Sequence, residues 1–265
     1  MKKITIIVLA NIISLAAVIF VNALAVLLPL GGKTTQELSD LYPNLFVPAG
    51  ITFSIWGVIY LSLIVFVWFT TFDFIRNKEG YLIKKVSRLF ILSSLANIVW
   101  IFAWQFQNLP LSLLAMIVLL ASLILLYLKL NIGASQVPTN IKYFVHLPIS
   151  IYLGWITVAT VANVTALLVA YHWNRFGLSE VFWTIVAIFI TLVVTALIII
   201  IRRDYSYGLV IIWALVGIII KRSAFNLLIS SYIVLAASIG VGILFIMIIF
   251  SKLLSESTRV TQKVR

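Results

Sequence analysis

Three hydrophobic stretches of the sequence carry aromatic and amide side chains at helical spacing. The sets are Phe53, Trp56 and Tyr60; Asn97, Trp100 and Trp104; and Tyr152, Trp155, Ala159 and Asn163. Steps of three and four residues place each set on one face of a helix. A tryptophan N–H or an asparagine amide buried in lipid needs a hydrogen-bonding partner, and a flat aromatic ligand with polar edges would supply one. Helix–helix packing, with Asn97 bonded to a neighbouring backbone, explains the same spacing, and spacing alone favours packing.

No other set of side chains predicts catalysis or metal binding. The chain has no cysteine, and nothing in the sequence pairs His146 with His172 in a metal-ligand or Ser-His-Asp arrangement. The seven acidic residues fall between the expected spans or at their ends. Ion-coupled pumps and transporters use buried ionisable groups, so this distribution argues against them. We therefore expect no catalytic residue, no metal site and no required cofactor.

Composition predicts an all-α, polytopic membrane helix bundle. The chain is 63% hydrophobic and 10% charged, and its mean hydropathy is +1.20. A bilayer core of about 30 Å needs about 20 apolar residues per helix, and eight such stretches are present. The expected spans are 4–29, 48–72, 88–107, 109–130, 144–171, 181–201, 206–220 and 226–250. The seventh is the shortest, and the first also fits a signal peptide, although its apolar run continues past the small residues that would mark cleavage.

The distribution of basic residues predicts the orientation of these spans. Of the 19 Lys and Arg residues, fifteen fall on the side of the two termini, and Lys33, Arg175, Lys221 and Arg222 fall on the other. Cytoplasmic loops are enriched in Lys and Arg, so both termini are expected in the cytoplasm, most simply at a bacterial cytoplasmic membrane. The net charge of +12 then reflects topology and attraction to the lipid bilayer, and no nucleic-acid partner is expected.

The loop GGKTTQELSDLYPNLFVPAG joins the first two spans and is the longest on its side of the membrane. Its glycines and prolines oppose regular helix, whereas Tyr42, Leu45 and Phe46 provide apolar surface to bury. With Pro48 just before the second span, the loop is suited to act as a lid, with Tyr42, Phe46 and Pro48 as its contact residues. An ordinary interfacial loop anchored by its aromatic side chains is the alternative.

Three blocks of sequence carry a resemblance to a known family. FVPAGITFSIWGVIY, NIVWIFAWQFQNLP and LPISIYLGWITVATVAN resemble the second, third and fifth helices of the TspO/MBR family, the translocator or tryptophan-rich sensory proteins. The most specific pattern is W-x-x-x-A-T-x-x-N, which is present as Trp155, Ala159, Thr160 and Asn163. The family usually has two prolines before its second helix, a Gly-Pro before its tryptophan and a tryptophan where this chain has Gly50. These differences affect the identity of the ligand more than the fold.

The resemblance implies five helices around a pocket closed by the first long loop. Family members bind porphyrins such as protoporphyrin IX or haem, and some bind sterols. By matching positions, Trp56, Asn97, Trp155 and Ala159 are expected to line the pocket, with Tyr60 and Trp100 beside them. Phe53 is added because it shares a helical face with Trp56.

The resemblance covers a five-helix unit and leaves the rest of the chain to be assigned from its residues. We expect a ligand-binding unit over 1–172, a further three-helix membrane segment over 173–253, and a basic cytoplasmic tail without regular structure over 254–265. The additional helices are expected to support the five-helix unit or to form a homodimer. Gly240 and Gly242 would permit close helix contact there.

The favoured function is a membrane-embedded binding or sensory protein for a hydrophobic small molecule, most simply a porphyrin or haem. The alternatives are a transporter of a hydrophobic metabolite and a light-dependent porphyrin-degrading enzyme. Trp56 and Trp155 match the residues implicated in that photochemistry in some family members.

Overall fold

A computed structural model of the chain describes residues 2–28, 30–224 and 228–263, and every element in this part of the chain is a helix. Within these described ranges, eight helical segments are long and apolar enough to cross a membrane. The helices are α1 (Lys2–Leu27), α2 (Thr35–Asp40), α3 (Ile55–Asn77), α4 (Tyr81–Gln105), α5 (Leu109–Leu130), α6 (Thr139–Ile141), α7 (Leu147–Ala170), α8 (Glu180–Leu197), α9 (Tyr205–Ser223) and α10 (Leu228–Lys263). Short 3₁₀ or π turns at Gly50–Ser54, Lys142–His146 and Ile198–Arg202 extend α3, α7 and α8. The predicted all-α membrane bundle is confirmed.

Local signals explain where the helices begin and end. Asn108 accepts a hydrogen bond from the backbone N–H of Leu111 and precedes Pro110, so α5 begins with one of its free N–H groups paired and a proline in its first turn. Ser179 caps α8 in the same way, through the N–H of Phe182. Lys78 and Asn131 adopt left-handed backbone angles after α3 and α5 and stop those helices.

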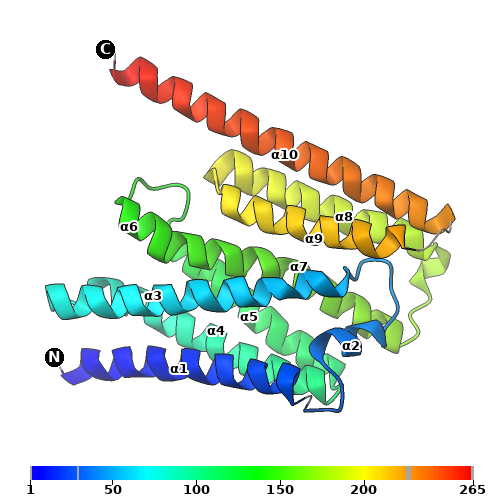
Figure 1. The fold of residues 1–265 in the computed structure, drawn as a ribbon, viewed down its shortest axis with the longest axis horizontal. Helices are drawn as coiled ribbons and strands as arrows, with labels where there is room; N and C mark the ends of the chain where they lie inside the picture. Colours follow the sequence, from blue (N-terminus) through cyan, green and yellow to red (C-terminus); the bar gives the residue numbers. More distant parts are fainter. Residues whose placement is uncertain (1, 29, 225–227, 264–265) are drawn as a thin grey trace.

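The helices form two packed groups that share one interface (Figure 1). In the first group α4 packs on α1 and α5, α5 packs on α7, and α3 packs on α7 and α1. In the second group α10 packs on α9 and α8. Helix α9 connects the groups because it also packs on α7 and on the turn that leads into α3. Figure 1 shows α10 along the outer side of α8 and α9.

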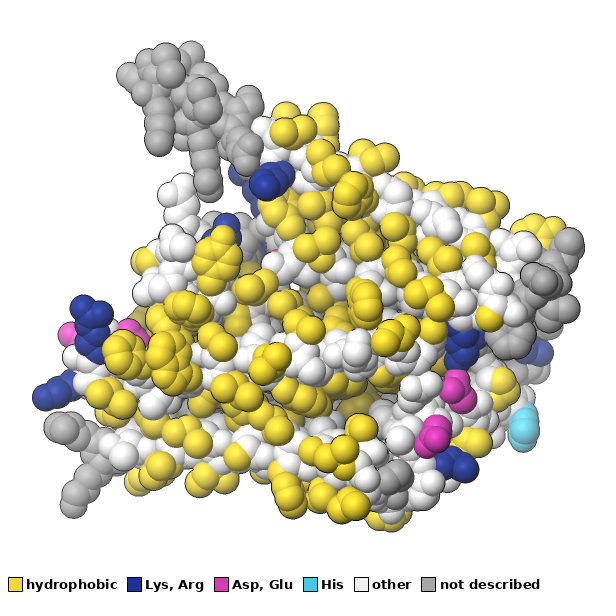
Figure 2. Space-filling view, in the orientation of Figure 1, with side chains coloured by type: hydrophobic (Ala, Val, Ile, Leu, Met, Phe, Trp, Pro, Cys, Tyr) yellow, Lys and Arg dark blue, Asp and Glu magenta, His cyan; other side chains and the backbone are white. Residues whose placement is uncertain are grey.

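The ends of the bundle carry the charges, as a membrane requires. Figure 2 shows hydrophobic side chains across the middle of one face and Lys, Arg, Asp and Glu side chains gathered towards its two ends. Large apolar side chains such as Leu61, Phe189 and Ile246 are more than 60% exposed along the spans. In lipid these surfaces are solvated by acyl chains, so their exposure does not destabilise the protein. The first described residues of α1 and the last of α10 lie at the same end of the bundle in Figure 1.

Some expected boundaries were wrong. Helix α4 begins at Tyr81, seven residues before the expected start of the third span, and its additional turns include charged residues, so the helix is longer than its apolar run. The seventh span, expected to be short, is a 19-residue helix, which is about 28 Å long at 1.5 Å per residue. The tail expected to lack regular structure continues α10 as helix to Lys263. Extending an existing helix avoids the cost of nucleation, and the tail contains no proline or glycine to stop it.

The backbone of α9 lies unusually close to the turn before α3. The N–H of Ala49 donates to the carbonyl oxygen of Gly217 over 2.9 Å, and the indole of Trp213 donates to the carbonyl oxygen of Thr52 over 3.0 Å. A Cβ at position 217 would overlap the Thr52 hydroxyl and lie 2.9 Å from the Cβ of Pro48. A small residue at this point lets the two backbones approach.

Asp204 is a buried carboxylate in the connection between α8 and α9. It is 6% exposed, and it accepts hydrogen bonds from the Ser150 hydroxyl at 2.7 Å and from the N–H of Tyr207 at 3.2 Å. Burial raises the pKa of Asp204 above its ordinary value of 3.8, although these hydrogen bonds oppose the shift. The carboxylate lies outside the spans as expected, but it packs against α7 instead of facing solvent.

A substitution at Gly217 tests the close approach of α9. Gly217→Ala is expected to lower the thermal midpoint of the detergent-purified protein, because overpacking of this kind costs about 1–3 kcal/mol. Gly242→Ala is the matched control, since a Cβ at that position meets no atom within 4 Å and alanine favours helix by up to about 1 kcal/mol. We use the term seam for the contact between α9 at Gly217 and the turn before α3. Equal midpoints for the two variants would show that this seam is not tightly packed.

Titration of Asp204 gives a pH-dependent prediction. The folded state holds this proton more tightly than the unfolded chain, so the stability that the proton provides is complete below 3.8 and is lost as the pH rises through the raised pKa. Thermal midpoints measured from about pH 4 to about pH 7 should therefore fall more for the wild type than for Asp204→Asn. Glu79→Gln, which changes an exposed carboxyl group, is the control. If the thermal midpoints of the wild type and of Asp204→Asn change with pH in parallel, the Asp204 carboxyl group does not contribute to the pH dependence of stability.

Candidate functional site

The three aromatic stripes meet at Trp56. Its ring stacks on Tyr60 with a centroid distance of 5.5 Å and on Trp100 with a centroid distance of 5.8 Å. The ring of Trp155 approaches Trp56 edge-on at 6.3 Å, and Phe53 approaches Trp155 edge-on at 5.9 Å. The structure therefore places five of the predicted residues, from α3, α4, α7 and the turn before α3, in one cluster.

A small cavity lies between this cluster and the loop above it. Its volume is about 40 Å³, and its lining residues are Thr35, Ser39, Pro48, Phe53, Trp56, Trp100, Trp104, Trp155, Val158, Ala159, Ala162 and Asn163. Pockets for small molecules usually have a volume of about 300–1,000 Å³. This cavity is much smaller, because the aromatic side chains pack against one another across it. Of the predicted site residues, Tyr60, Asn97, Tyr42 and Phe46 do not line this cavity.

Two of the indoles that line the cavity have no hydrogen-bond partner. Within the part of the chain that the structure describes, no acceptor lies within reach of the buried Nε1–H groups of Trp100 and Trp155, and the Tyr60 hydroxyl beside them is also unpaired. The Trp104 indole, by contrast, donates to the carbonyl oxygen of Thr35 at 3.2 Å. Buried donors without partners cost free energy. Two residues of the cavity lining, Trp100 and Trp155, therefore carry indole donors that no described protein group uses.

Asn97 is satisfied by protein partners. Its Oδ1 accepts from the Asn22 amide at 2.8 Å, its Nδ2 donates to the Tyr152 hydroxyl at 3.1 Å, and the residue is fully buried. These bonds connect α1, α4 and α7. The geometry agrees with the packing interpretation in its general form, although the partners of Asn97 are side chains instead of a backbone group. Asn163 is paired similarly with Ser112 of α5.

Several residues of this region were not among those expected to line the pocket. Trp104 and Asn163 belong to the stripes and line the cavity, so their spacing was a usable signal. Asn22 was the other available signal, because a lone amide in an apolar span requires a partner. Thr35 and Ser39 belong to α2, a helix of six residues inside the expected lid loop, and nothing in the sequence placed them over the cavity.

The loop over the cavity has local structure of its own. Thr34 and Glu37 form a reciprocal capping box that begins α2, and the hydrogen bonds from the Thr34 backbone and side chain lower the pKa of Glu37. Asn44 then turns the chain by accepting hydrogen bonds from the N–H groups of Phe46 and Val47, both at 3.1 Å. Phe46 is 2% exposed, so the loop buries an aromatic anchor as predicted.

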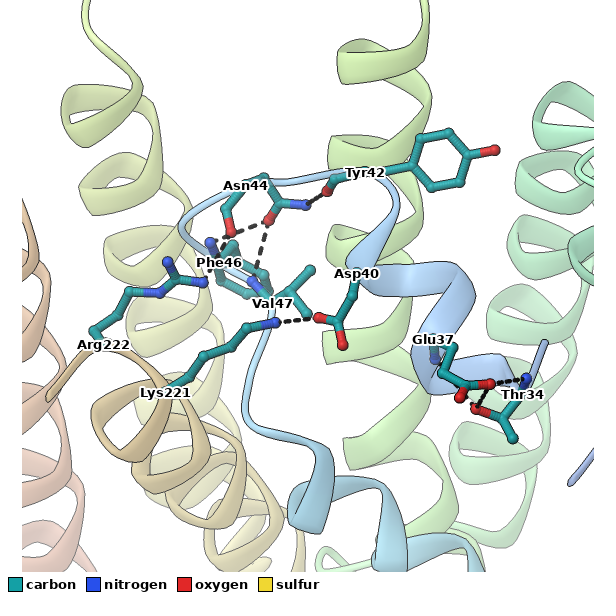
Figure 3. Close-up of polar contacts among 9 residues, drawn as sticks. All are labelled: Thr34, Glu37, Asp40, Tyr42, Asn44, Phe46, Val47, Lys221 and Arg222. Carbon is teal, nitrogen blue, oxygen red and sulfur yellow. Dashed lines mark hydrogen bonds and ion pairs between the residues drawn. The ribbon is translucent and has the colours of Figure 1, made fainter. Parts of the chain in front are cut away.

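Helix α9 binds this loop from the other side. Figure 3 shows Lys221 and Arg222 reaching from the end of α9 to the loop. Lys221 forms a 2.5 Å ion pair with Asp40, and Arg222 donates to the carbonyl oxygen of Asn44 at 3.1 Å. On the opposite side Tyr42 donates to the side chain of Gln107 at 3.2 Å. The loop is therefore held between the five N-terminal spans and α9.

Fold and site together define a class: a polytopic helical membrane protein with a tryptophan-lined cavity beneath a structured loop. Residues 7–250 match the family model described as TSPO-like protein. The chain therefore belongs to the TSPO-like protein family, as its three sequence blocks predicted. The matched range includes α8 and α9 and most of α10, so the family pattern extends beyond the five N-terminal spans.

This membership indicates a membrane protein of the ligand-binding or sensory class. No curated protein and no solved structure matches the chain.

Among the residues that the structure describes, no group of three or more His, Cys, Asp or Glu side chains is placed to hold a metal ion.

A double-mutant cycle tests the role of Asn97 as a structural connection. Asn97→Leu and Asn22→Leu are each expected to destabilise the protein, because each leaves the other amide without its partner. The double variant should lose less than the sum, with a coupling of about 0.6 kcal/mol or more. Unfolding in mixed micelles provides the measurement. Strict additivity would show that the two amides do not act together.

Proposed function

We propose that the protein binds a porphyrin or haem in the cavity beneath the loop and acts as a binding or sensory protein for that ligand. The observation that carries the proposal is the pair of unpartnered indole N–H groups, on Trp100 and Trp155, in the wall of an aromatic cavity. A tetrapyrrole is flat and aromatic and carries acidic groups at its edge. It would therefore stack on the rings and accept hydrogen bonds from the indoles.

Binding requires the cavity to open, because about 40 Å³ cannot hold a tetrapyrrole. Trp56 occupies the centre of the site and is stacked between Tyr60 and Trp100. A flat ligand would replace one of these stacking contacts if the Trp56 ring turned aside. Pro48 and Ser39 of the loop lie over the same space, so the loop must also move, as expected of a lid.

The membrane topology that we propose follows from the distribution of charges and the number of spans. Eight spans place the beginning of α1 and the end of α10 on the same side of the membrane. That side carries most of the Lys and Arg residues, so we place it in the cytoplasm of a bacterium and the lid on the outer face. A homodimer remains a prediction.

Two alternative functions are also compatible with the family resemblance. Light-dependent porphyrin breakdown is favoured by the contact of Trp56 with Trp155 and Trp100, because a ligand stacked there would touch several indoles. It predicts loss of porphyrin absorbance under illumination that Trp56→Phe or Trp155→Phe suppresses. Transport of a hydrophobic metabolite predicts flux of the ligand across sealed vesicles, which a binding protein would not produce.

Titration with protoporphyrin IX and with haem tests the proposal. Trp100→Phe and Trp155→Phe keep an aromatic ring and remove the N–H, so each is expected to weaken binding about fivefold, the equivalent of a hydrogen bond worth about 1 kcal/mol. Affinity is measured from the absorbance of the ligand, because eight tryptophans make quenching ambiguous.

Trp68→Phe is the matched control for this titration. Trp68 lies on α3 and is 58% exposed, away from the cavity, so this variant should bind as the wild type does. Saturable binding that no cavity substitution weakens would place the tetrapyrrole elsewhere. Absence of saturable binding would remove the tetrapyrrole and leave sterols and other apolar molecules as ligands to test.

A further inference from the structure

A second cavity lies between α7 and α8, outside the aromatic site. Its volume is about 710 Å³, which is within the range of small-molecule sites. In the described part of the chain α7 packs on α5 and α9, whereas α8 packs on α10 and α9. These consecutive helices therefore diverge and leave space between them. Ile190 lines this space and is 55% exposed, so the cavity opens onto the lipid-facing surface.

The walls of the cavity are apolar along the spans. Val164 and Leu168 of α7 face Ala187 of α8 across it. The threonines of the walls already use their hydroxyls within their own helices: Thr160 donates to Ile156, Thr165 to Ala162 and Thr184 to Glu180. No polar ligand is required inside the bilayer part of the cavity, and an apolar chain is the occupant that such walls favour.

The mouth of the cavity is polar and lies in the connection between α7 and α8. His172, Arg175 and Glu180 line it, and Trp183 lies beside them with its indole donating to the Arg175 carbonyl oxygen at 2.9 Å. Tryptophans and cationic side chains at a span end are typical of the headgroup level of a membrane. Arg222 of α9 interacts electrostatically with Glu180, so this carboxylate is partly compensated and Arg175 leaves the mouth cationic.

We propose that this cavity is a lipid site that binds an acyl chain between α7 and α8 and its anionic headgroup at Arg175. The ligand class is an anionic amphiphile, either a phospholipid or a fatty acid. Guanidinium groups bind phosphate and carboxylate oxygens in the same way, so both sources fit the mouth. Pro43, Asn44 and Phe46 of the lid loop form part of the lining.

This site is independent of the proposed tetrapyrrole site. The two cavities share no lining residue, because α7 presents Thr160, Val161 and Val164 to one and Val158, Ala159 and Ala162 to the other. Substitutions in the lipid cavity are therefore expected to leave the affinity for haem unchanged, and failure of either proposal does not decide the other.

Native mass spectrometry of delipidated protein tests the lipid site. The probes are palmitoyl-oleoyl phosphatidylglycerol, oleate and, as the zwitterionic comparison without net charge, palmitoyl-oleoyl phosphatidylcholine. Val164→Phe and Ala187→Phe fill the cavity from opposite walls. Each substitution should weaken the binding of a single lipid molecule per protein about tenfold. Val193→Phe adds the same ring to α8 at a position that is 41% exposed and outside the cavity, and it should bind as the wild type does. Circular dichroism and size-exclusion profiles establish that each variant is folded.

The headgroup is tested by Arg175→Gln, with Lys33→Gln as the control for another exposed basic residue on the same membrane face. Arg175→Gln should weaken binding of the anionic probes about fivefold and binding of phosphatidylcholine less, because the choline group offsets the charge of its phosphate. The anionic probe with the larger loss identifies phospholipid or fatty acid as the source. If both filled variants retain lipid as Val193→Phe does, the site is wrong. Equal affinity for all three probes in the wild type and in Arg175→Gln would overturn the anionic headgroup.

Discussion

The close contact between α9 and the turn before α3 is the constraint on which the arrangement of the site depends. Gly217 removes the side chain that would separate the two backbones, and Ala49 and Trp213 then form hydrogen bonds across the seam. Inside a membrane there is little hydrophobic force between helices, so association depends on close packing and on hydrogen bonds such as these. The seam fixes Pro48 over the aromatic cavity and brings the end of α9 to the lid.

The same constraint gives the C-terminal helices a role in the site. Without α9, the lid would lack the ion pair of Asp40 with Lys221 and the hydrogen bond from Arg222 to Asn44. Exposed ion pairs contribute little stability individually, but here they supplement a backbone contact that already holds the loop. The loop is thereby connected to α9, and α9 in turn packs on α8 and α10.

Polar groups inside the bundle are divided between structure and binding. Asn22, Asn97 and Tyr152 bond with one another, and Asn163 bonds with Ser112. These groups are satisfied, so they stabilise the fold and offer nothing to a ligand. The indoles of Trp100 and Trp155 find no acceptor among the residues that the structure describes. This contrast separates the amides, whose hydrogen bonds hold the helices together, from the indoles, on which the proposed binding site depends.

The sequence by itself determined the number of spans, the membrane class and the family, because apolar length and the tryptophan motif are local properties of the chain. Five of the residues that it indicated line the small cavity: Trp56, Trp100, Trp155 and Ala159, which were expected from the family resemblance, and Phe53, which was expected because it shares a helical face with Trp56. Tertiary structure decided which face meets which. It paired Asn97 with Asn22, 75 residues away, and thereby removed that amide from the cavity. It also brought α9 onto the lid and opened the space between α7 and α8. These outcomes depend on contacts between distant segments, and a residue pattern within one helix carries no information about its partner.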